Sequence, residues 1–409
     1  MTNLQLGWID FSKDQRDKVM KILHSLAQKT ALDELGIGAI RDGFADIFFP
    51  GTSTLQTRAK YFVLIPYIFR EILTVKPIRK GTTLEQLEQQ ELELINILKE
   101  DKSGDDLRGI IGQDSGQNLK RKPSSIYWSG IRSWKIYNPL EEHLKNFSLN
   151  QYCTYIDNHL GKREQEKMSG KKRDDDEDAL NDDPTYMITG LSFLDFPDKI
   201  PDSLNQLTIQ LTHDEAVFLQ KKILASHGES LLAHFLGPNN WHSLPQDNPS
   251  FQDLLSLSGY KDPEMARKIQ LASWFATFNK IINVRFNWLL REGMNREAYE
   301  RKWQEALVQV NNLGDNHLEE IFNLLNLHRE SETKTKLFLL TVYDSLTRGG
   351  FDKVDRVIRE REQSLKKSRS KFKNIKQLNL EHNIGIEDLD YRFSVALRLL
   401  ADIHQGLEK

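Results

Sequence analysis

Residues 84–100, LEQLEQQELELINILKE, form the clearest helical stretch of this 409-residue sequence. They combine strong helix formers with apolar residues at intervals of three and four, which is typical of a helix with one buried face. The sequence therefore predicts a predominantly α-helical, multi-helical protein with few short strands. The same pattern predicts further helices over residues 229–236, 251–257, 263–291, 296–311, 315–328, 330–347, 351–370 and 387–407.

Helix boundaries can be predicted where capping residues or helix breakers occur. Thr212 and Glu215 have the spacing of a capping box, in which each side chain bonds the other residue's backbone amide, and Ser12 and Gln15 share this spacing. After the break at residues 49–51 (FPG), a helix is expected to begin at Ser53 or Thr54, with Pro66 kinking or splitting it. Residues 207–211 alternate like a short strand.

A charged segment, residues 161–184, predicts the domain division. It holds six basic and nine acidic residues with almost no large apolar one, so it is expected to be a solvated linker. We therefore expect a helical N-terminal lobe over residues 1–160 and a helical C-terminal lobe over 185–409.

Composition excludes several classes of protein. With 56 Lys and Arg against 59 Asp and Glu, the net charge of −3 rules out a uniformly basic nucleic-acid binder but not a local basic face. The single cysteine excludes a disulfide framework and a Cys-rich metal site. No apolar run reaches membrane-spanning length and no signal-peptide pattern is found, so a cytoplasmic protein that does not enter a membrane is expected.

Familiar catalytic motifs are missing from the sequence. It has no phosphate-binding P-loop, no dinucleotide-binding glycine motif, no nucleophile elbow and no zinc-binding HExxH helix, so we predict no cofactor, no metal and no catalytic residue. His227, His234 and His242 are interpreted as ordinary histidines, and Cys153 as a small, partly buried side chain.

Three groups of sequence blocks carry a resemblance to a known family. The first is residues 8–12 (WIDFS), 34–38 (ELGIG) and 49–58 (FPGTSTLQTR). The second is 124–128 (SSIYW) and 131–134 (IRSW). The third is 359–374, 389–392 and 399–407. With these blocks the sequence resembles the uncharacterised bacterial domain-of-unknown-function family 6361. The resemblance implies a gene near anti-phage defence genes, but it implies no chemistry.

The block at residues 49–58 is a candidate anion site. A helix beginning there would expose free amides beside the hydroxyl groups, with a basic residue one turn later, and such a site can bind phosphate. The alternative is a structural core in which Arg41, Asp42, Asp46 and Arg58 form salt bridges. A third interpretation is an unrecognised hydrolase that uses Asp42, Asp46 and Arg58. The anion-binding candidates are Thr52, Ser53, Thr54 and Arg58.

The second group suggests a winged-helix-like unit in the N-terminal lobe. It would combine a helix near residues 91–99, a basic stretch over 108–122 and the helix containing Tyr127 and Trp128. In the alternative interpretation, Tyr127, Trp128 and Trp134 are core aromatics. The basic candidates of this unit are Lys120, Arg121 and Lys122.

The strongest charge signal is residues 353–376, which hold ten Lys or Arg and three acidic residues, a local net charge of +7. An exposed basic face there would bind nucleic-acid phosphates with salt-dependent, sequence-independent affinity. The alternatives are neutralisation by acidic groups near Asp388 and Asp390, or docking onto an acidic protein. The candidate nucleic-acid-binding residues here are Arg361, Lys366, Lys367, Arg369, Lys371 and Lys373.

Together these patterns predict a non-enzymatic, nucleic-acid-associated protein of a bacterial anti-phage defence locus. Its expected partners are DNA or RNA and proteins from the same locus. The alternative is a scaffold or adaptor subunit that holds an ATPase or nuclease.

Overall fold

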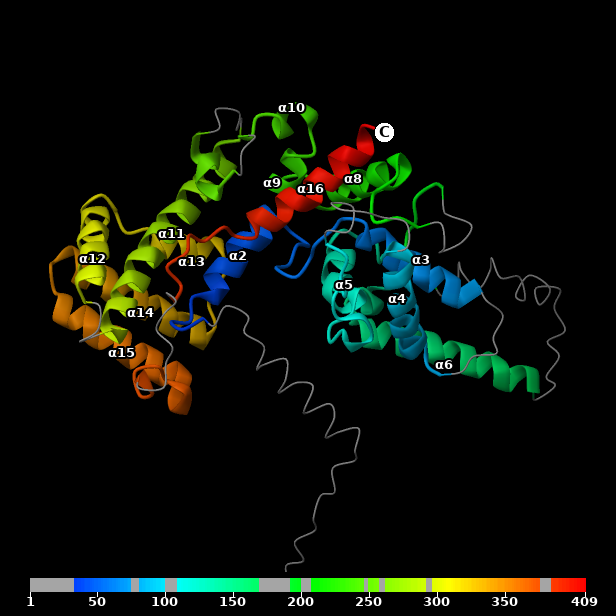
Figure 1. The fold of residues 1–409 in the computed structure, drawn as a ribbon, viewed down its shortest axis with the longest axis horizontal. Helices are drawn as coiled ribbons and strands as arrows, with labels where there is room; N and C mark the ends of the chain where they lie inside the picture. The colour runs from blue at the N-terminus through cyan, green and yellow to red at the C-terminus, as the bar shows by residue number, and fades with distance from the viewer. Residues whose placement is uncertain are drawn as a thin grey trace, which may run out of the picture. The chain divides into compact units, whose positions relative to one another are not determined.

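The described part of the chain is built almost entirely from α-helices (Figure 1). The structure is a computed structural model, and it describes residues 33–74, 81–99, 109–168, 192–199, 207–245, 249–256, 262–291, 296–375 and 384–409. Within those residues there is no sheet, and an isolated β-bridge joins Tyr137 and Leu194. The prediction of a predominantly α-helical protein is confirmed.

The chain forms two compact units, and each is made from separate stretches of sequence. Unit 1 combines the described residues of 1–39 with 275–388, and unit 2 combines 40–274 with 389–409. This division differs from the predicted lobes 1–160 and 185–409. Helix α6 (Leu149–Met168) continues through the predicted boundary, so residues 161–168 of the expected linker are helical, while residues 169–184 lie outside the described residues.

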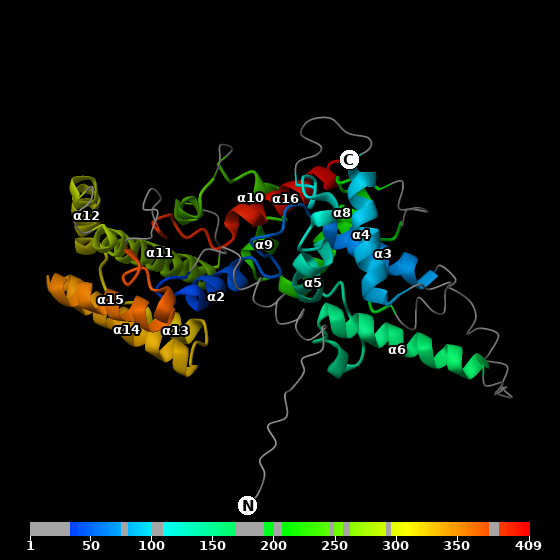
Figure 2. The same ribbon diagram turned by 60° about the horizontal axis from the view of Figure 1, so that its bottom comes forward.

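Unit 1 is a helical unit in which α14 and α15 lie side by side (Figures 1 and 2). Leu339 and Val342 of α14 and Val354 and Ile358 of α15 are fully buried, because their spacing places them on one face of each helix. Besides the later part of α11 (Pro263–Leu290), the unit contains α12 (Arg296–Asn311), α13 (Leu318–Leu324), α14 (Glu330–Thr347), α15 (Phe351–Lys366) and the 3-10 turn η7 (Lys367–Arg369).

Unit 2 is organised around α3, a mostly buried helix that packs against α4 and α5 (Figure 1). The C-terminal helix α16 packs along α8 in the same unit. Its α-helices are α2 (Gly38–Phe48), α3 (Tyr61–Thr74), α4 (Thr83–Lys99), α5 (Pro123–Ser133), α6, α8 (His213–His227), α9 (Leu231–His234), α10 (Pro238–Trp241), the earlier part of α11 and α16 (Phe393–Leu407). The described 3-10 turns of this unit are η2 (Gly116–Asn118), η3 (Glu142–Leu144) and η6 (Phe251–Ser256).

The predicted helix boundaries have mixed outcomes. The capping box at the start of α8 is confirmed: the Thr212 amide donates to Glu215 (2.8 Å) and the Glu215 amide to the Thr212 hydroxyl (3.3 Å). Pro66 does not split α3, which continues through it. The box at Ser12 and Gln15 lies outside the described residues.

The predicted strand over residues 207–211 is wrong. Leu207, Ile209 and Leu211 are buried, as their alternation predicts, but this segment forms no strand and no ladder in the described structure. The alternation of apolar and polar residues correctly predicts that every second side chain is buried here. A β-strand also needs a neighbouring strand to which its backbone is hydrogen-bonded.

Two further features of the fold bear on the predicted functions. No hairpin that would serve as a wing occurs in the described residues, so the winged-helix-like unit stays a prediction. None of the helices that the structure describes combines the length and the apolar character needed to cross a membrane.

Candidate nucleic-acid interface

The block at residues 49–58 is a turn and loop in front of α3. Helix α3 begins at Tyr61, so the prediction of a helix start at Ser53 or Thr54 is wrong. Gln56 explains the difference, because its side chain accepts a hydrogen bond from the Ser53 amide (3.0 Å) and donates one to the Gly51 carbonyl (3.1 Å). These bonds close the loop on itself.

Two of the four predicted anion-binding side chains, those of Thr52 and Arg58, have partners within the protein. The Thr52 hydroxyl donates to the Phe49 carbonyl at 2.6 Å. The Nε of Arg58 lies 3.0 Å from both carboxylate oxygens of Asp402, which also accepts the Ala59 amide at 2.8 Å. Ser53 is half-buried and Thr54 is exposed. These contacts favour the structural interpretation, and anion binding at this loop stays a prediction.

Lys60 and Glu215 form a buried ion pair that the sequence reading missed. Their side chains are 2% and 1% exposed, and Nζ lies 2.7 and 2.5 Å from the two carboxylate oxygens. The Tyr67 hydroxyl donates to the same carboxylate at 3.2 Å. The capping box identified Glu215, but no local pattern shows that its carboxylate also pairs with a lysine far away in sequence.

The second group of blocks packs directly on the first. The Tyr127 hydroxyl accepts the amides of Thr57 (2.8 Å) and Arg58 (3.1 Å). The Trp134 indole donates to the Pro50 carbonyl at 2.8 Å, and its ring is stacked on another buried aromatic ring. Tyr127 and Trp134 are fully buried and Trp128 is 5% exposed, so all three are core aromatics, as the alternative interpretation has it.

Asp42 and Asp46 are surface carboxylates that pair with arginines. Asp46 accepts a hydrogen bond from Arg392 at 2.7 Å, and Asp42 lies 3.0 Å from the Nε of Arg41. Arg58 pairs with Asp402 instead. Across the described ranges, no group of three His, Cys, Asp or Glu residues could hold a metal ion.

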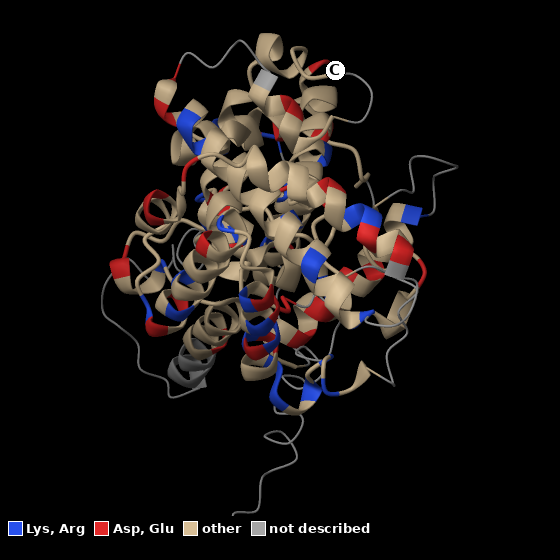
Figure 3. Cartoon of the chain, turned by 90° about the vertical axis from the view of Figure 1, so that its left-hand side faces the viewer, with Lys and Arg blue, Asp and Glu red and all other residues tan. Residues whose placement is uncertain are grey.

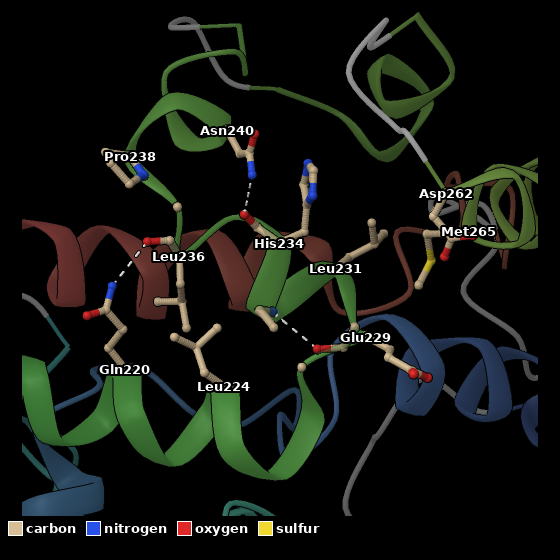
Figure 4. Close-up of a pocket in the computed structure, with 14 residues that line it drawn as sticks. Gln220, Leu224, Glu229, Leu231, His234, Leu236, Pro238, Asn240, Asp262 and Met265 are labelled. Carbon is tan, nitrogen blue, oxygen red and sulfur yellow. Dashed lines mark hydrogen bonds between the residues drawn. The ribbon is translucent and has the colours of Figure 1, made fainter.

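His227, His234 and Cys153 all make contacts within unit 2, and the Nε2 of His227 lies 2.9 Å from the Ser133 hydroxyl oxygen. His227 Nε2 lies 2.9 Å from the Ser133 carbonyl, and the backbone of His234 accepts a hydrogen bond from Asn240 (Figure 4). His234 lines a cavity of about 600 Å³ whose charged lining residues are the acids Glu229 and Asp262, so the cavity offers no cation to an anionic ligand. Burial raises the pKa of the Cys153 thiol to about 12, which disfavours the nucleophilic thiolate.

The basic stretch before α5 is only partly available to a ligand. Lys120 is exposed, Arg121 is half-buried, and the Nζ of Lys122 lies 3.4 Å from the Leu119 carbonyl. Arg108 lies outside the described residues. Nucleic-acid contact by this stretch stays a prediction.

The basic segment after residue 353 divides into inward and outward side chains. Arg361 donates to the Leu35 carbonyl (3.0 Å) and to the Thr335 hydroxyl (2.6 Å), and burial lowers its pKa. Lys371 and Lys366 lie 3.0 and 3.7 Å from the buried carboxylate of Glu34. The expectation that Arg361 and Lys371 line the exposed face is therefore wrong.

The acids that neutralise this segment also differ from those expected. Glu34 pairs with two of the lysines, whereas Asp355 of the segment itself pairs with Arg285, outside the segment, at 2.6 Å. Asp388 instead pairs with Lys280, and Asp390 bonds the Ser394 hydroxyl. Neutralisation thus occurs for Lys366 and Lys371, through the carboxylate of Glu34 far away in the sequence.

Three cations point outward after α15: Lys367, Arg369 and Lys373, which we call the cationic turn. All three are exposed, and no carboxylate among the described residues pairs with them. Figure 3 shows that basic and acidic residues are otherwise interspersed on the chain. The cationic turn is therefore one part of the predicted basic segment that stays open to a ligand, and Lys353 and Arg356 of α15 are exposed as well.

A buried carboxylate holds the cationic turn in place. Glu362 is fully buried in α15, and it accepts hydrogen bonds from the Ser370 hydroxyl (2.5 Å) and the Lys371 amide (2.5 Å). The Asn374 side chain donates to the Ser368 carbonyl (2.9 Å). In the sequence, Glu362 was counted only as one of the acidic residues of the segment. Its spacing from Val354 and Ile358 places it on the buried face of α15, and this spacing could have predicted its burial.

Comparison with known proteins identifies a family over part of the chain. Residues 3–159 match the family of unknown function DUF6361, which confirms the resemblance for that region. The third group of blocks, after residue 358, lies beyond the match. No curated protein and no solved structure matches the chain.

Proposed function

We propose that this protein is a non-enzymatic, nucleic-acid-associated protein that contacts the phosphate backbone of DNA or RNA through the cationic turn. The observation that carries the proposal is the exposure of Lys367, Arg369 and Lys373 with no carboxylate partner among the described residues, on a turn anchored by buried Glu362. Cations that are already paired inside a protein have little to gain from a phosphate. Unpaired exposed cations release the counterions condensed on nucleic acid when they bind it.

The expected binding is weak and independent of sequence. Phosphate contacts position a protein on nucleic acid but carry no base information. Three such contacts place the affinity in the range of non-specific binding, roughly 10⁻⁴ to 10⁻⁶ M at physiological salt. Lys120, Arg121 and Lys122 of unit 2 are proposed as additional contacts.

The proposed setting is the cytoplasm of a bacterium, at an anti-phage defence locus. The resemblance to the family supports this setting, and protein partners from the same locus belong to the proposal. The identity of the neighbouring genes tests it: defence genes support the setting, and a housekeeping operon contradicts it.

Charge-neutralising variants test the cationic turn. In the triple variant Lys367→Gln, Arg369→Gln and Lys373→Gln, we expect the affinity for a fluorescent 20-base-pair duplex, measured by anisotropy at low salt, to fall at least tenfold. The control triple neutralises three other exposed cations and loses the same net charge. It is Lys221→Gln, Arg301→Gln and Arg348→Gln.

The two triples separate a local site from a general charge effect. Weak loss in the control together with strong loss in the cationic-turn triple supports the proposal. No binding of the wild-type protein to duplex DNA, single-stranded DNA or RNA, or equal losses in both triples, contradicts it.

A further inference from the structure

A second candidate site lies in unit 2, at the C-terminal end of α5, and we call it the α5 pocket. It has a volume of about 440 Å³, within the range of small-molecule pockets. Its lining includes three cations, Arg132, Lys135 and Lys145, together with the amide side chains of Asn138 and Asn146. This composition differs from the cavity at His234, whose charged lining residues are acids.

The charge balance of the α5 pocket favours an anion. No acidic residue lines it, and the nearest carboxylate partner is that of Glu142, which lies 2.6 Å from Lys145 in an exposed ion pair. An exposed pair of this kind is weak, so Lys145 can exchange it for a ligand at little cost. Lys135 is exposed and has no carboxylate partner within the described residues.

Arg132 has hydrogen-bonding capacity that the protein does not use. One terminal nitrogen donates to the Asn146 side chain at 3.1 Å, whereas the buried Nε has no hydrogen-bond partner in the described structure. Buried polar groups without partners are rare because leaving them unsatisfied costs free energy. A guanidinium binds oxyanions through two parallel N–H groups, so a small shift of this side chain toward a bound oxyanion satisfies Nε.

The backbone at Lys135 adds an independent observation. The Lys135 amide donates to the Arg132 carbonyl (3.0 Å) and the Ile136 amide to the Ile131 carbonyl (2.9 Å), which is the Schellman ending of a helix. The residue at this position adopts a left-handed conformation, here with φ of 51°, and is usually glycine. A lysine there places a cation at the pocket despite a less favourable backbone.

We propose that the α5 pocket binds a phosphate-class oxyanion, either free phosphate or the phosphate group of a small phosphorylated molecule. Arg132, Lys135 and Lys145 supply the charge, and Asn138 supplies a neutral donor. The favourable interaction of a cation with a helix C-terminus accounts for Lys135 alone. It does not account for the convergence of three cations and an unsatisfied guanidinium nitrogen.

Calorimetric titration of the full chain in low-salt buffer tests this proposal. The probes are inorganic phosphate and adenosine 5′-monophosphate, with sodium chloride as the control for ionic strength. We expect saturable binding of at least one probe with one site per chain. Tighter binding of the nucleotide assigns the ligand to phosphorylated organic molecules, and equal or tighter binding of phosphate assigns it to the free ion.

Lys135→Gly is the decisive variant because glycine suits the backbone at this position. The variant removes one cation while relieving the left-handed strain, so we expect an unchanged or higher melting temperature together with at least a fivefold loss of phosphate affinity. Lys145→Gln should weaken binding similarly, and the control Lys221→Gln should leave it within twofold of wild type.

Several outcomes would overturn the site. These are no saturable binding of either probe, or an affinity that Lys135→Gly and Lys145→Gln leave unchanged. The cationic-turn triple of unit 1 should bind phosphate as wild type does, so failure of the nucleic-acid proposal and failure of this one are distinguishable.

Discussion

At the scale of one residue, Gly51 of the first group of blocks packs against Trp134 of the second group. Its φ of 80° is left-handed, and a Cβ atom there would lie 2.3 Å from the Trp134 indole nitrogen. The FPG sequence is therefore needed for packing against α5 as well as for the turn. This role could not be predicted from the sequence, because no local pattern shows that Trp134 covers the turn.

The variant Gly51→Ala should destabilise unit 2 by more than about 2 kcal/mol, since left-handed strain of about 1–2 kcal/mol adds to the clash with Trp134. Gly116→Ala is the matched control, because Gly116 also has a positive φ (48°) but nothing lies within 4 Å of its Cβ position. Urea unfolding of both variants measures the difference. Equal losses of stability would contradict the packing role.

Glu91 predicts a pH dependence of stability at the same scale. Burial raises the pKa of this carboxyl from 4.5 to about 7, while the Ser124 amide (2.5 Å) and hydroxyl (2.8 Å) donate to it. Between pH 4.5 and about pH 7, the Glu91 carboxyl keeps its proton in the folded protein, whereas in the unfolded chain it loses that proton. Stability from this group therefore falls as pH rises through that window, by about 1.4 kcal/mol per pH unit.

Glu91→Gln removes this titration while keeping the shape of the side chain. We expect the variant to gain stability relative to wild type as pH rises from 4.5 to 8, with little relative change below pH 4.5. Urea unfolding at several pH values measures the gain. Parallel pH profiles for the two proteins would show that Glu91 does not titrate in this way.

At the scale of elements, Glu362 connects the sequence of α15 to the proposed function. The buried face of α15 carries Val354, Ile358 and Glu362. The Glu362 carboxylate anchors the turn that follows the helix. Glu362→Ala removes a negative charge, which by itself would strengthen binding to nucleic acid. We predict the opposite, about a three- to tenfold weaker affinity, because the turn that presents Lys367, Arg369 and Lys373 loses its anchor.

Hydrogen exchange at the Lys371 amide checks the cause, since that amide donates to Glu362. Faster exchange together with weaker binding supports an anchoring role. An affinity that rises in Glu362→Ala would mean that total charge, and not the arrangement of the turn, controls binding.

Local patterns predicted elements well and loops poorly. The Thr212 capping box and the helices over 84–100 and 351–370 could be predicted, because propensity, capping and periodicity are properties of neighbouring residues. The start of α3 could not, since Gln56 closes a loop through side-chain bonds that compete with a helix. The inward orientation of Arg361 could not be predicted either, because its hydrogen-bond partners, Leu35 and Thr335, lie far away in the sequence.

At the scale of the whole molecule, sequence order and spatial order diverge. Each unit combines separate stretches of the chain, so residues near position 35 belong with 275–388 and the C-terminal helix belongs with 40–274. A compositional boundary such as the charged segment at 161–184 is a local property of the sequence and cannot report which distant segments pack together. The carboxylate of Glu34 accordingly pairs with Lys366 and Lys371 of the basic segment, more than 330 positions away in the sequence.

The net charge of −3 has to be interpreted with this pairing in mind. The local +7 of residues 353–376 is reduced by Glu34, whose buried carboxylate pairs with Lys366 and Lys371. The exposed cations that remain include the cationic turn, besides Lys353 and Arg356 on α15. Of these exposed cations, the proposal assigns phosphate contact to the three residues of the cationic turn.

The salt dependence of nucleic-acid binding tests this central claim most directly. Each phosphate contact contributes about −0.9 to the slope of log affinity against log salt concentration, so three contacts contribute about −2.7. We predict that the slope for a 20-base-pair duplex decreases in magnitude by about that amount in the Lys367→Gln, Arg369→Gln, Lys373→Gln triple and stays unchanged in the control triple. An unchanged slope in the cationic-turn triple would contradict the account.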